Sequence, residues 1–278
     1  MLLPLILAFD VGPPALEIRV TEARQGNTLA IWVRGEAASM TLRFLDRERP
    51  LYPHGDWHRA LVGIPIKQAP GPHPLVLEAT DAAGNVVVEG QIVDIADVDW
   101  PFGGTLRGLP KPPTDNEAKK AAREARDGAY AATLPDQFWD EALSMPLQGR
   151  ITSDFGRYRA RESGYRSHHD ALDIGAASGT PIYAAGPGEV LVSAFQPLHG
   201  NAVILGHGQE VTTSYNHMSG LAVEVGQRVN EGDLVGWVGS TGQSTGPHLH
   251  WGLVVDEIAV DPTQWLDEAF LLPPPPKG

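Results

Sequence analysis

The chain has 278 residues, no cysteine and a formal net charge of −13. Its length suits two globular domains, and its acidic balance argues against binding to nucleic acid and against electrostatic docking on anionic membranes or wall polymers. The lack of cysteine excludes disulfides and thiolate metal sites, so a transition-metal site would have to use His, Asp or Glu.

Residues 1–8 form an apolar run that is too short to cross a bilayer. The run resembles the apolar core of a secretory signal, although it lacks the basic leader. We therefore expect residues 1–14 to be either the remnant of a signal peptide or a stray apolar terminus. No later segment is long and apolar enough to predict an integral membrane segment.

Between residues 15 and 97 the sequence shows short runs in which apolar and polar residues alternate. The runs lie at residues 16–20, 29–33, 40–44 and 75–79, with turn residues between them. Alternation with a period of two predicts an antiparallel β-sandwich, and residues 71–85 resemble bacterial immunoglobulin-like modules. This segment has no paired carboxylates, histidine cluster or aromatic run, so we expect a spacer or targeting domain.

Residues 98–145 have the composition of a connector. Prolines interrupt regular structure at Pro101, Pro110, Pro112 and Pro113. Residues 114–132 are rich in Ala, Lys, Glu and Arg, with Asp115 or Thr114 as the N-cap, and they predict one exposed helix. The helix would pack on one side only or act as a spacer. Residues 272–278 predict an extended, proline-rich tail.

Residues 146–271 combine frequent glycines with short β-branched runs, which predicts an all-β domain. Seven of the ten histidines lie in this segment. Three of them, His169, His248 and His250, belong to two short motifs that carry the chemistry. The first motif contains His169 and Asp173, and the second contains His248 and His250.

The spacing within these motifs fits a metal site. On a strand, residues two apart share one face, about 6.5–7 Å from each other, so His248 and His250 either converge on one metal or divide metal binding and proton transfer between them. Two histidines and one carboxylate leave a fourth tetrahedral position open, as catalytic zinc requires. The glycine-rich residues 239–247 allow close backbone approach and help to shape a cleft.

Residues 151–261 resemble the lysostaphin and LytM type of zinc metallopeptidases, a family of peptidoglycan hydrolases. The family pattern is His-x-x-x-Asp early, His-x-His late and another His between, which is His217 here. Other matching blocks lie at residues 151–157, 179–186, 214–219 and 229–236. Ala171 stands where the family usually has Gly, and Met218 where Leu is usual, but neither departure removes a ligand.

The resemblance implies an all-β LytM-type domain, similar to a duplicated hybrid motif, over residues 146–271. It implies zinc held by His169, Asp173 and His250. It also implies that His248 is the general base and that His217 hydrogen-bonds the oxyanion. The implied activity is hydrolysis of peptide bonds in peptidoglycan, in stem-peptide crosslinks or bridges, by a protein of the cell envelope or the extracellular space.

The sequence also gives expectations for three further histidines and for two residues near the motifs. His168 is expected to be a solvated neighbour of a ligand, while His199 and His207 lie in turn-like sequence. Tyr215 and Arg157 either line the groove or serve as a packed ring and a solvated charge.

Three other functions remain open. The first is a catalytically silent LytM-type regulator that binds the wall or activates an amidase. The second is a binding or structural module in which the sandwich is the functional part. The third is an enzyme that acts on peptides outside the wall.

Overall fold

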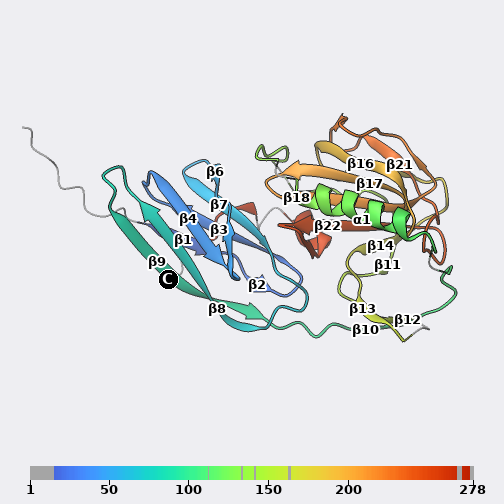
Figure 1. Ribbon diagram of the computed structural model, residues 1–278, viewed down its shortest axis with the longest axis horizontal. Helices are drawn as coiled ribbons and strands as arrows, with labels where there is room; N and C mark the ends of the chain where they lie inside the picture. Colours follow the sequence, from blue (N-terminus) through green and yellow to red (C-terminus); the bar gives the residue numbers. More distant parts are fainter. Residues whose placement is uncertain are drawn as a thin grey trace, which may run out of the picture.

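The computed structural model describes residues 16–111, 113–132, 134–140, 142–161, 164–267 and 271–275. Within these residues the protein is mainly β with one α-helix, as predicted, and it forms two lobes side by side (Figure 1). The expected signal remnant and the last three residues of the proline-rich tail lie outside them. No helix in the described ranges has the length and hydropathy that a membrane span requires.

The N-terminal lobe is a β-sandwich of two sheets, as the alternating sequence predicted. The four-stranded sheet has the order β1 (Glu17–Val20), β3 (Thr28–Arg34), β7 (Trp57–Gly63), β6 (Tyr52–His54). The five-stranded sheet has the order β2 (Ala23–Arg24), β9 (Val86–Ala96), β8 (Gly71–Thr80), β4 (Ser39–Phe44), β5 (Arg47–Arg49). Inward side chains of both sheets, among them Ile31, Phe44 and Leu77, form the core between them.

Strand β3 departs from simple alternation. Residues 29–33 are buried at every position, and Ala30 and Trp32 belong to the core of the other lobe. The alternation expected for residues 29–33 was therefore wrong, because the outer face of β3 packs against the C-terminal lobe. A continuous apolar run is typical of a strand that is buried on both faces.

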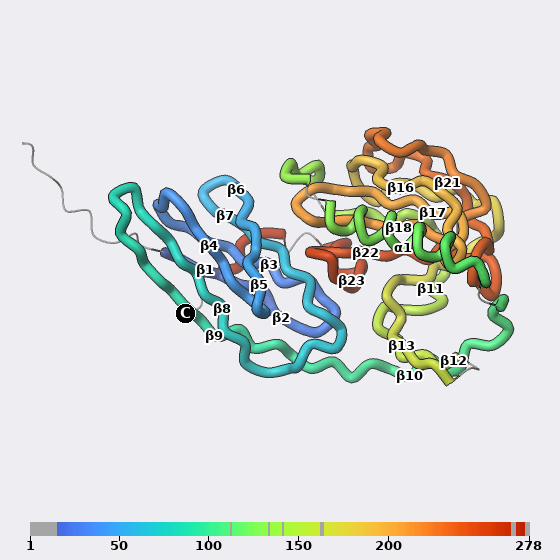
Figure 2. The backbone as a smooth tube through the Cα atoms, viewed as in Figure 1, coloured from blue at the N-terminus to red at the C-terminus, as the bar shows by residue number. Residues whose placement is uncertain are grey.

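The connector contains a strand as well as the predicted helix. Strand β10 (Phe102–Leu106) pairs in parallel with β12 (Tyr158–Arg161), which pairs in turn with β13 (Arg166–His168). Helix α1 (Asn116–Tyr130) begins after Asp115, whose carboxylate accepts a hydrogen bond from the Ala118 N–H at 2.9 Å. Figure 2 shows the chain leaving β9, running below the C-terminal lobe in this view to β10 and turning back into α1.

The C-terminal lobe is built on one large antiparallel sheet. Its order is β11 (Arg150–Ser153), β14 (Leu172–Gly175), β22 (His248–Val255), β18 (Val211–Met218), β17 (Gly200–Gly208), β16 (Gly188–Gln196), β20 (Arg228–Val229), with β23 (Ile258–Val260) paired to β22. A small sheet of β15 (Pro181–Tyr183), β21 (Leu234–Trp237) and β19 (Gly220–Leu221) lies beside it, and the 3₁₀ helix η1 spans Pro262–Leu266. Helix α1 packs on β16, β17 and β18.

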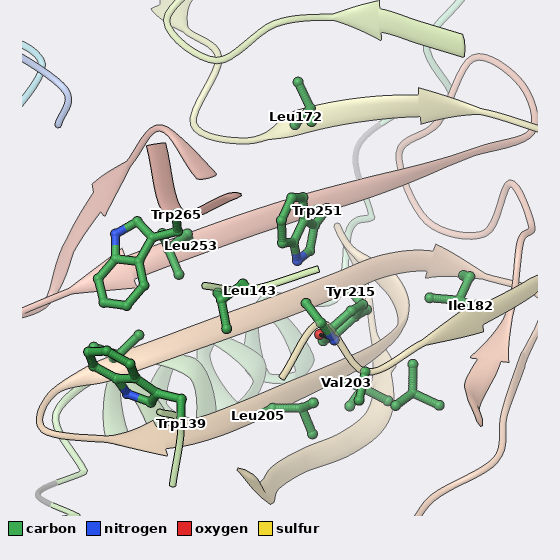
Figure 3. Close-up of a cluster of buried hydrophobic side chains, with 14 of the residues drawn as sticks. Trp139, Leu143, Leu172, Ile182, Val203, Leu205, Tyr215, Trp251, Leu253 and Trp265 are labelled. Atoms are coloured by element: carbon green, nitrogen blue, oxygen red, sulfur yellow. Dashed lines mark hydrogen bonds between the residues drawn. The ribbon is translucent and has the colours of Figure 1, made fainter. Parts of the chain in front are cut away.

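The core of this lobe lies between the large sheet, the small sheet and the segment that precedes β11 (Figure 3). Trp251 and Tyr215 occupy neighbouring strands, and both are fully buried. The backbone N–H of Ala185 donates to the Tyr215 hydroxyl at 2.9 Å. Tyr215 therefore packs in the core and does not line the groove.

The two lobes share a buried interface. The Trp265 indole donates to Thr28 Oγ1 at 2.9 Å. Arg49 forms an ion pair with Asp256 in which both side chains are almost fully buried. The Arg59 guanidinium lies 5.4 Å from the Trp32 ring centroid and 4.6 Å from that of a tryptophan in the C-terminal lobe, Trp139. The sandwich is therefore docked on the C-terminal lobe and is more than a tethered spacer.

Candidate metal centre

Two neighbouring strands position the two histidine motifs. Asp173 in β14 and His250 in β22 are direct partners in the antiparallel register, so their side chains leave the sheet on the same face. The next residues along β22, Leu249 and Trp251, point the other way and are fully buried in the core. One face of β22 is thus held in the core by Leu249 and Trp251, and His248 and His250 lie on the opposite face.

Three ligand atoms converge at this point. His250 Nδ1 lies 2.9 Å from Asp173 Oδ1, and His169 Nε2 lies 3.0 Å from the same oxygen. The two histidine nitrogens are 3.2 Å apart. Metal–ligand bonds of about 2.0–2.1 Å in tetrahedral geometry place ligand atoms about 3.3 Å from one another. The donor set and its spacing therefore fit a zinc ion, and the structure brings together the three residues that the sequence pointed to.

A second layer of contacts fixes these ligands. His169 Nδ1 donates to the carbonyl oxygen of Asp154 at 2.9 Å, which leaves Nε2 as the ligand atom. Arg159 Nη2 donates to Asp173 Oδ2 at 2.9 Å and also contacts Ser153 Oγ. Because Oδ2 is engaged, Asp173 offers one oxygen to a metal.

The Asp173 carboxylate is held in its charged form. Burial alone would raise its pKa, but hydrogen bonds and charge interactions with His169 and His250 outweigh burial and hold the pKa below its usual range. A metal binds the anionic form of a carboxylate, and Asp173 is in this form throughout the neutral pH range.

His217 and His248 lie beside the ligand set without belonging to its tightest triplet. Their ring centroids are 5.0 Å apart, and together with His250 they form a second, wider group whose ligand atoms lie within 4.8 Å of one another. His248 Nδ1 donates to Gly246 O and His217 Nδ1 donates to Thr241 O, both at 2.8 Å. Each neutral ring therefore keeps a proton on Nδ1 and an unprotonated Nε2.

The backbone around His217 is constrained. His217 has a φ of 63°, in the left-handed region, and its N–H donates to His199 O at 2.7 Å. A Cβ atom at Gly239 would lie 2.8 Å from His217 O and 2.4 Å from Ser219 N. Only glycine allows this approach, in line with the close backbone approach expected within residues 239–247. Burial, followed by the charge of His250, lowers the pKa of His217 to about 4.

These side chains line a cleft of about 670 Å³. One wall is formed by the β12–β13 hairpin and the residue before it, with Arg157, Arg159 and Arg161. Three connector residues, Gly103, Leu106 and Leu109, extend this wall. Gln243 Nε2 donates to Pro110 O at 3.1 Å, so the connector is tied to the loop that precedes β22. The connector forms a wall of the cleft.

Several other residues differ from their expected surroundings. His168 is half-buried, with its ring centroid 5.1 Å from that of Tyr158, rather than solvated. His207 lies inside β17 and is fully buried, so its placement in a turn was wrong. His199 lies just before β17 and lines the cleft, and Arg157 lines it as well, paired with Asp154 at 3.2 Å.

Sequence reasoning gave no role to Arg159 or to the carbonyl of Asp154. Asp154 lies within the block at residues 151–157 that resembles the family, and Arg159 follows two positions after that block. The block therefore indicated the region of the chain but not these two contacts. The contact of Arg159 with Asp173 depends on how β12 folds over β14, and no local pattern signals it.

Comparisons with known proteins agree with this geometry. The model of peptidase family M23 matches residues 167–262. The peptidoglycan DD-endopeptidase ShyA of Vibrio cholerae is 39% identical over 133 residues, which are 47% of this chain and 31% of ShyA. The peptidoglycan DD-endopeptidase ShyC of the same organism is 38% identical over 122 residues, 43% of this chain and 28% of ShyC. The match thus spans less than a third of either relative.

A solved structure covers more of the chain. The crystal structure of a Pseudomonas aeruginosa protein named for peptidase M23 superposes with a TM-score of 0.64 and 26% identity, over 84% of this chain and 90% of that one. The likeness therefore takes in parts of both lobes. Together, the family match, the two relatives and the converging His and Asp side chains identify residues 167–262 as a peptidase family M23 domain.

Proposed function

We propose that this chain is a zinc-dependent endopeptidase that hydrolyses peptide bonds in bacterial peptidoglycan. The observation that carries the proposal is the set of three ligand atoms, His169 Nε2, Asp173 Oδ1 and His250 Nδ1, which lie 2.9–3.2 Å from one another at the floor of a cleft. Relatives named as peptidoglycan DD-endopeptidases support the substrate class. A peptidoglycan substrate places the protein in the cell envelope or outside the cell.

His169, Asp173 and His250 would hold the zinc ion, with one nitrogen or oxygen each. When bound there, zinc supplies Lewis-acid polarisation of the scissile carbonyl and lowers the pKa of water. The chain contributes a preformed ligand set, since His169 is held by Asp154 and Asp173 is held by Arg159. It also contributes the cleft in which a peptide would lie beside these residues.

His248 would move the proton. Its Nδ1 proton is bonded to Gly246 O, so the free Nε2 can accept a proton from the attacking water and return it to the leaving amine. His248 Nε2 lies 3.7 Å from Asp173 Oδ1, which places it beside the ligands but outside bonding distance.

His217 would stabilise the oxyanion only after its Nε2 takes up a proton from solvent, and this proton would return to solvent when the oxyanion collapses. In the neutral ring the Nδ1 proton is bonded to Thr241 O, so Nε2 has no hydrogen to donate. The lowered pKa of about 4 keeps this ring neutral at rest. Negative charge that develops on the substrate favours the protonated ring, which can then donate from Nε2. The division of roles between His217 and His248 rests on the family resemblance, because both rings present an acceptor nitrogen.

The silent regulator is the second candidate that the sequence left open. Loss of a ligand or of a catalytic histidine would favour it. All five side chains are present and converge, which favours the enzyme.

The test combines metal content with product analysis. Purified full-length protein is expected to contain one zinc per chain and to release peptide-cleaved fragments from purified peptidoglycan, identified by mass spectrometry. The His250→Ala variant is expected to lose both properties. Full zinc occupancy in His250→Ala would contradict the ligand assignment, and a zinc-loaded wild type that releases no fragments would favour the regulator.

A further inference from the structure

A second pocket, of about 350 Å³, lies beside the cleft, between helix α1 and the turn that joins β16 to β17. We call it the helix pocket. It shares two lining residues with the cleft, Leu198 and His199. His199 is also bonded through its carbonyl to the N–H of His217, at 2.7 Å. The helix pocket and the cleft therefore adjoin at these two residues.

The helix pocket is cationic in a chain whose net charge is −13. Lys119, Arg123 and Arg126 line it, and Asp127 is the only acidic residue among its lining residues. Arg123 and Asp127 pair at 3.5 Å across an exposed turn of α1. Among the ion pairs of the described residues, none involves Lys119 or Arg126.

Arg126 carries its charge among neutral acceptors. It donates to Gln196 Oε1 and to Asn216 Oδ1, each at 3.0 Å, and to the Tyr130 hydroxyl. These three acceptors are all neutral, so the contacts hold the guanidinium in place without neutralising its charge. Asn216 in turn donates to the backbone carbonyl of His250 at 3.1 Å. Arg126 is therefore bonded to a residue of β18, the strand beside the one that carries His250.

The remaining wall of the helix pocket is apolar. Pro197, Leu198 and the ring of Tyr130 contribute most of it. Apolar walls keep water away and strengthen the attraction between a cation and an anion, because the local dielectric constant is lower than that of water. The helix pocket thus combines uncompensated positive charge with a surface for an aliphatic chain.

We propose that the helix pocket is a carboxylate subsite, which binds a carboxylate-bearing substituent of the peptide whose backbone lies in the cleft. The proposal rests on the proposed function, since it concerns the substrate of the same site. Lys119 and Arg123 make direct charge-assisted contacts with the carboxylate, and Arg126 sets the positive potential of the pocket floor. The subsite selects acidic peptides over amidated ones.

The experiment compares two cross-linked peptides that differ only at the carboxylates, one with free acids and one fully amidated. The test variant is the double substitution Lys119→Gln and Arg123→Gln, which spares the bonds of Arg126 to β16 and β18. Lys120→Gln is the matched control, because Lys120 lies on the same helix, pairs with Glu124 at 3.8 Å and does not line the helix pocket.

We expect the double variant to raise KM for the free-acid peptide about tenfold with kcat unchanged, since a contact made equally in the ground and transition states affects KM alone. KM for the amidated peptide and both constants of Lys120→Gln should equal the wild-type values. An equal rise in KM for both peptides, or no rise for either, would overturn the subsite.

Direct binding separates this proposal from the proposed function. In a His248→Ala background, peptide affinities are measured by fluorescence anisotropy with labelled free-acid and amidated peptides. The free-acid peptide should bind about tenfold more tightly, and Lys119→Gln with Arg123→Gln should remove that difference. If the wild type cleaves neither peptide, the peptidase function fails, while the anisotropy difference still decides the subsite.

Discussion

Arg159 Nη2 lies 2.9 Å from Oδ2 of Asp173, while Oδ1 of the same carboxylate faces His169 and His250. The guanidinium therefore occupies Oδ2, and Oδ1 is left to bind a metal. It also brings a positive charge close to the position where a divalent cation would bind. Arg159 contacts no reacting atom, so its role would be to position the ligand.

Arg159→Met should weaken zinc binding by about 10–100-fold, the usual cost of losing an outer contact to a metal ligand. The loss of orientation of Asp173 outweighs the relief of repulsion between the two cations. Competition with a chromogenic chelator measures the affinity. Arg157→Met is the control, because Arg157 belongs to the same wall but pairs with Asp154. Equal zinc affinities in the two variants would remove the positioning role.

His248→Ala and His217→Asn should each keep one zinc per chain and lose most of the activity. We expect losses of about 10²–10⁴-fold for the general base and about 10²–10³-fold for the oxyanion donor. Asparagine is used at position 217 because it tolerates the φ of 63° better than alanine does. Zinc content and hydrolysis rate are measured side by side. Near-normal turnover excludes that residue from the mechanism, and loss of zinc shows it to be a ligand.

The buried pair of Arg49 and Asp256 joins the two lobes. Asp256→Asn should lower the free energy of unfolding by about 3 kcal/mol, because it leaves the buried Arg49 guanidinium without its partner carboxylate. Asparagine accepts the φ of 51° at this position. Urea denaturation measures the change. Glu257→Gln next to it removes only an exposed contact to Arg47, at 3.6 Å, and should change stability by less than about 0.5 kcal/mol.

His207 should make stability depend on pH. Burial lowers its pKa to about 4 in the folded protein, whereas an unfolded histidine has a pKa of about 6.5. Between these values the unfolded chain binds a proton that the folded chain does not, so stability falls as the pH drops from about 6.5 towards about 4, by on the order of 3 kcal/mol.

The measurement is urea unfolding at about pH 7 and about pH 4.5 for the wild type and for His207→Gln. Glutamine can still reach Pro187 O, which His207 Nδ1 contacts at 2.7 Å, but it has no proton to gain. The variant should lose less stability between the two pH values than the wild type does. The same loss in both proteins would assign the pH dependence to other groups.

The proposed ligand set could be predicted from the sequence because the spacing within each motif is local. Asp173 lies four positions after His169, and His248 and His250 lie two positions apart on one strand, so each pair indicates its chemistry without knowledge of the fold. The meeting of the pairs depends on the register of β14 and β22, which no local pattern gives. The resemblance to the family, and not the periodicity of the sequence, indicated that the two motifs meet at one site.

The interface between the lobes could not be predicted in the same way. The apolar run at residues 29–33 signals burial on both faces, but it does not say what covers the second face. The cover comes from Trp139 and Trp265, which are far away in sequence. The same limit applies to His207, because a short polar–glycine stretch looks like a turn although its neighbours in the sheet bury it.

The chain crosses between the lobes more than once, and this has a consequence for fragments of the protein. After the sandwich the chain continues into β10, which pairs with β12 of the cleft wall. Near the C-terminus, Gln264 in η1 donates to Thr28 O in the sandwich. Arg19 in β1 donates to Pro274 O at 2.8 Å. A single protease cut between β10 and α1 would leave each piece holding part of the shared interior. The nicked protein would run as two bands on a denaturing gel and elute as one species under native conditions.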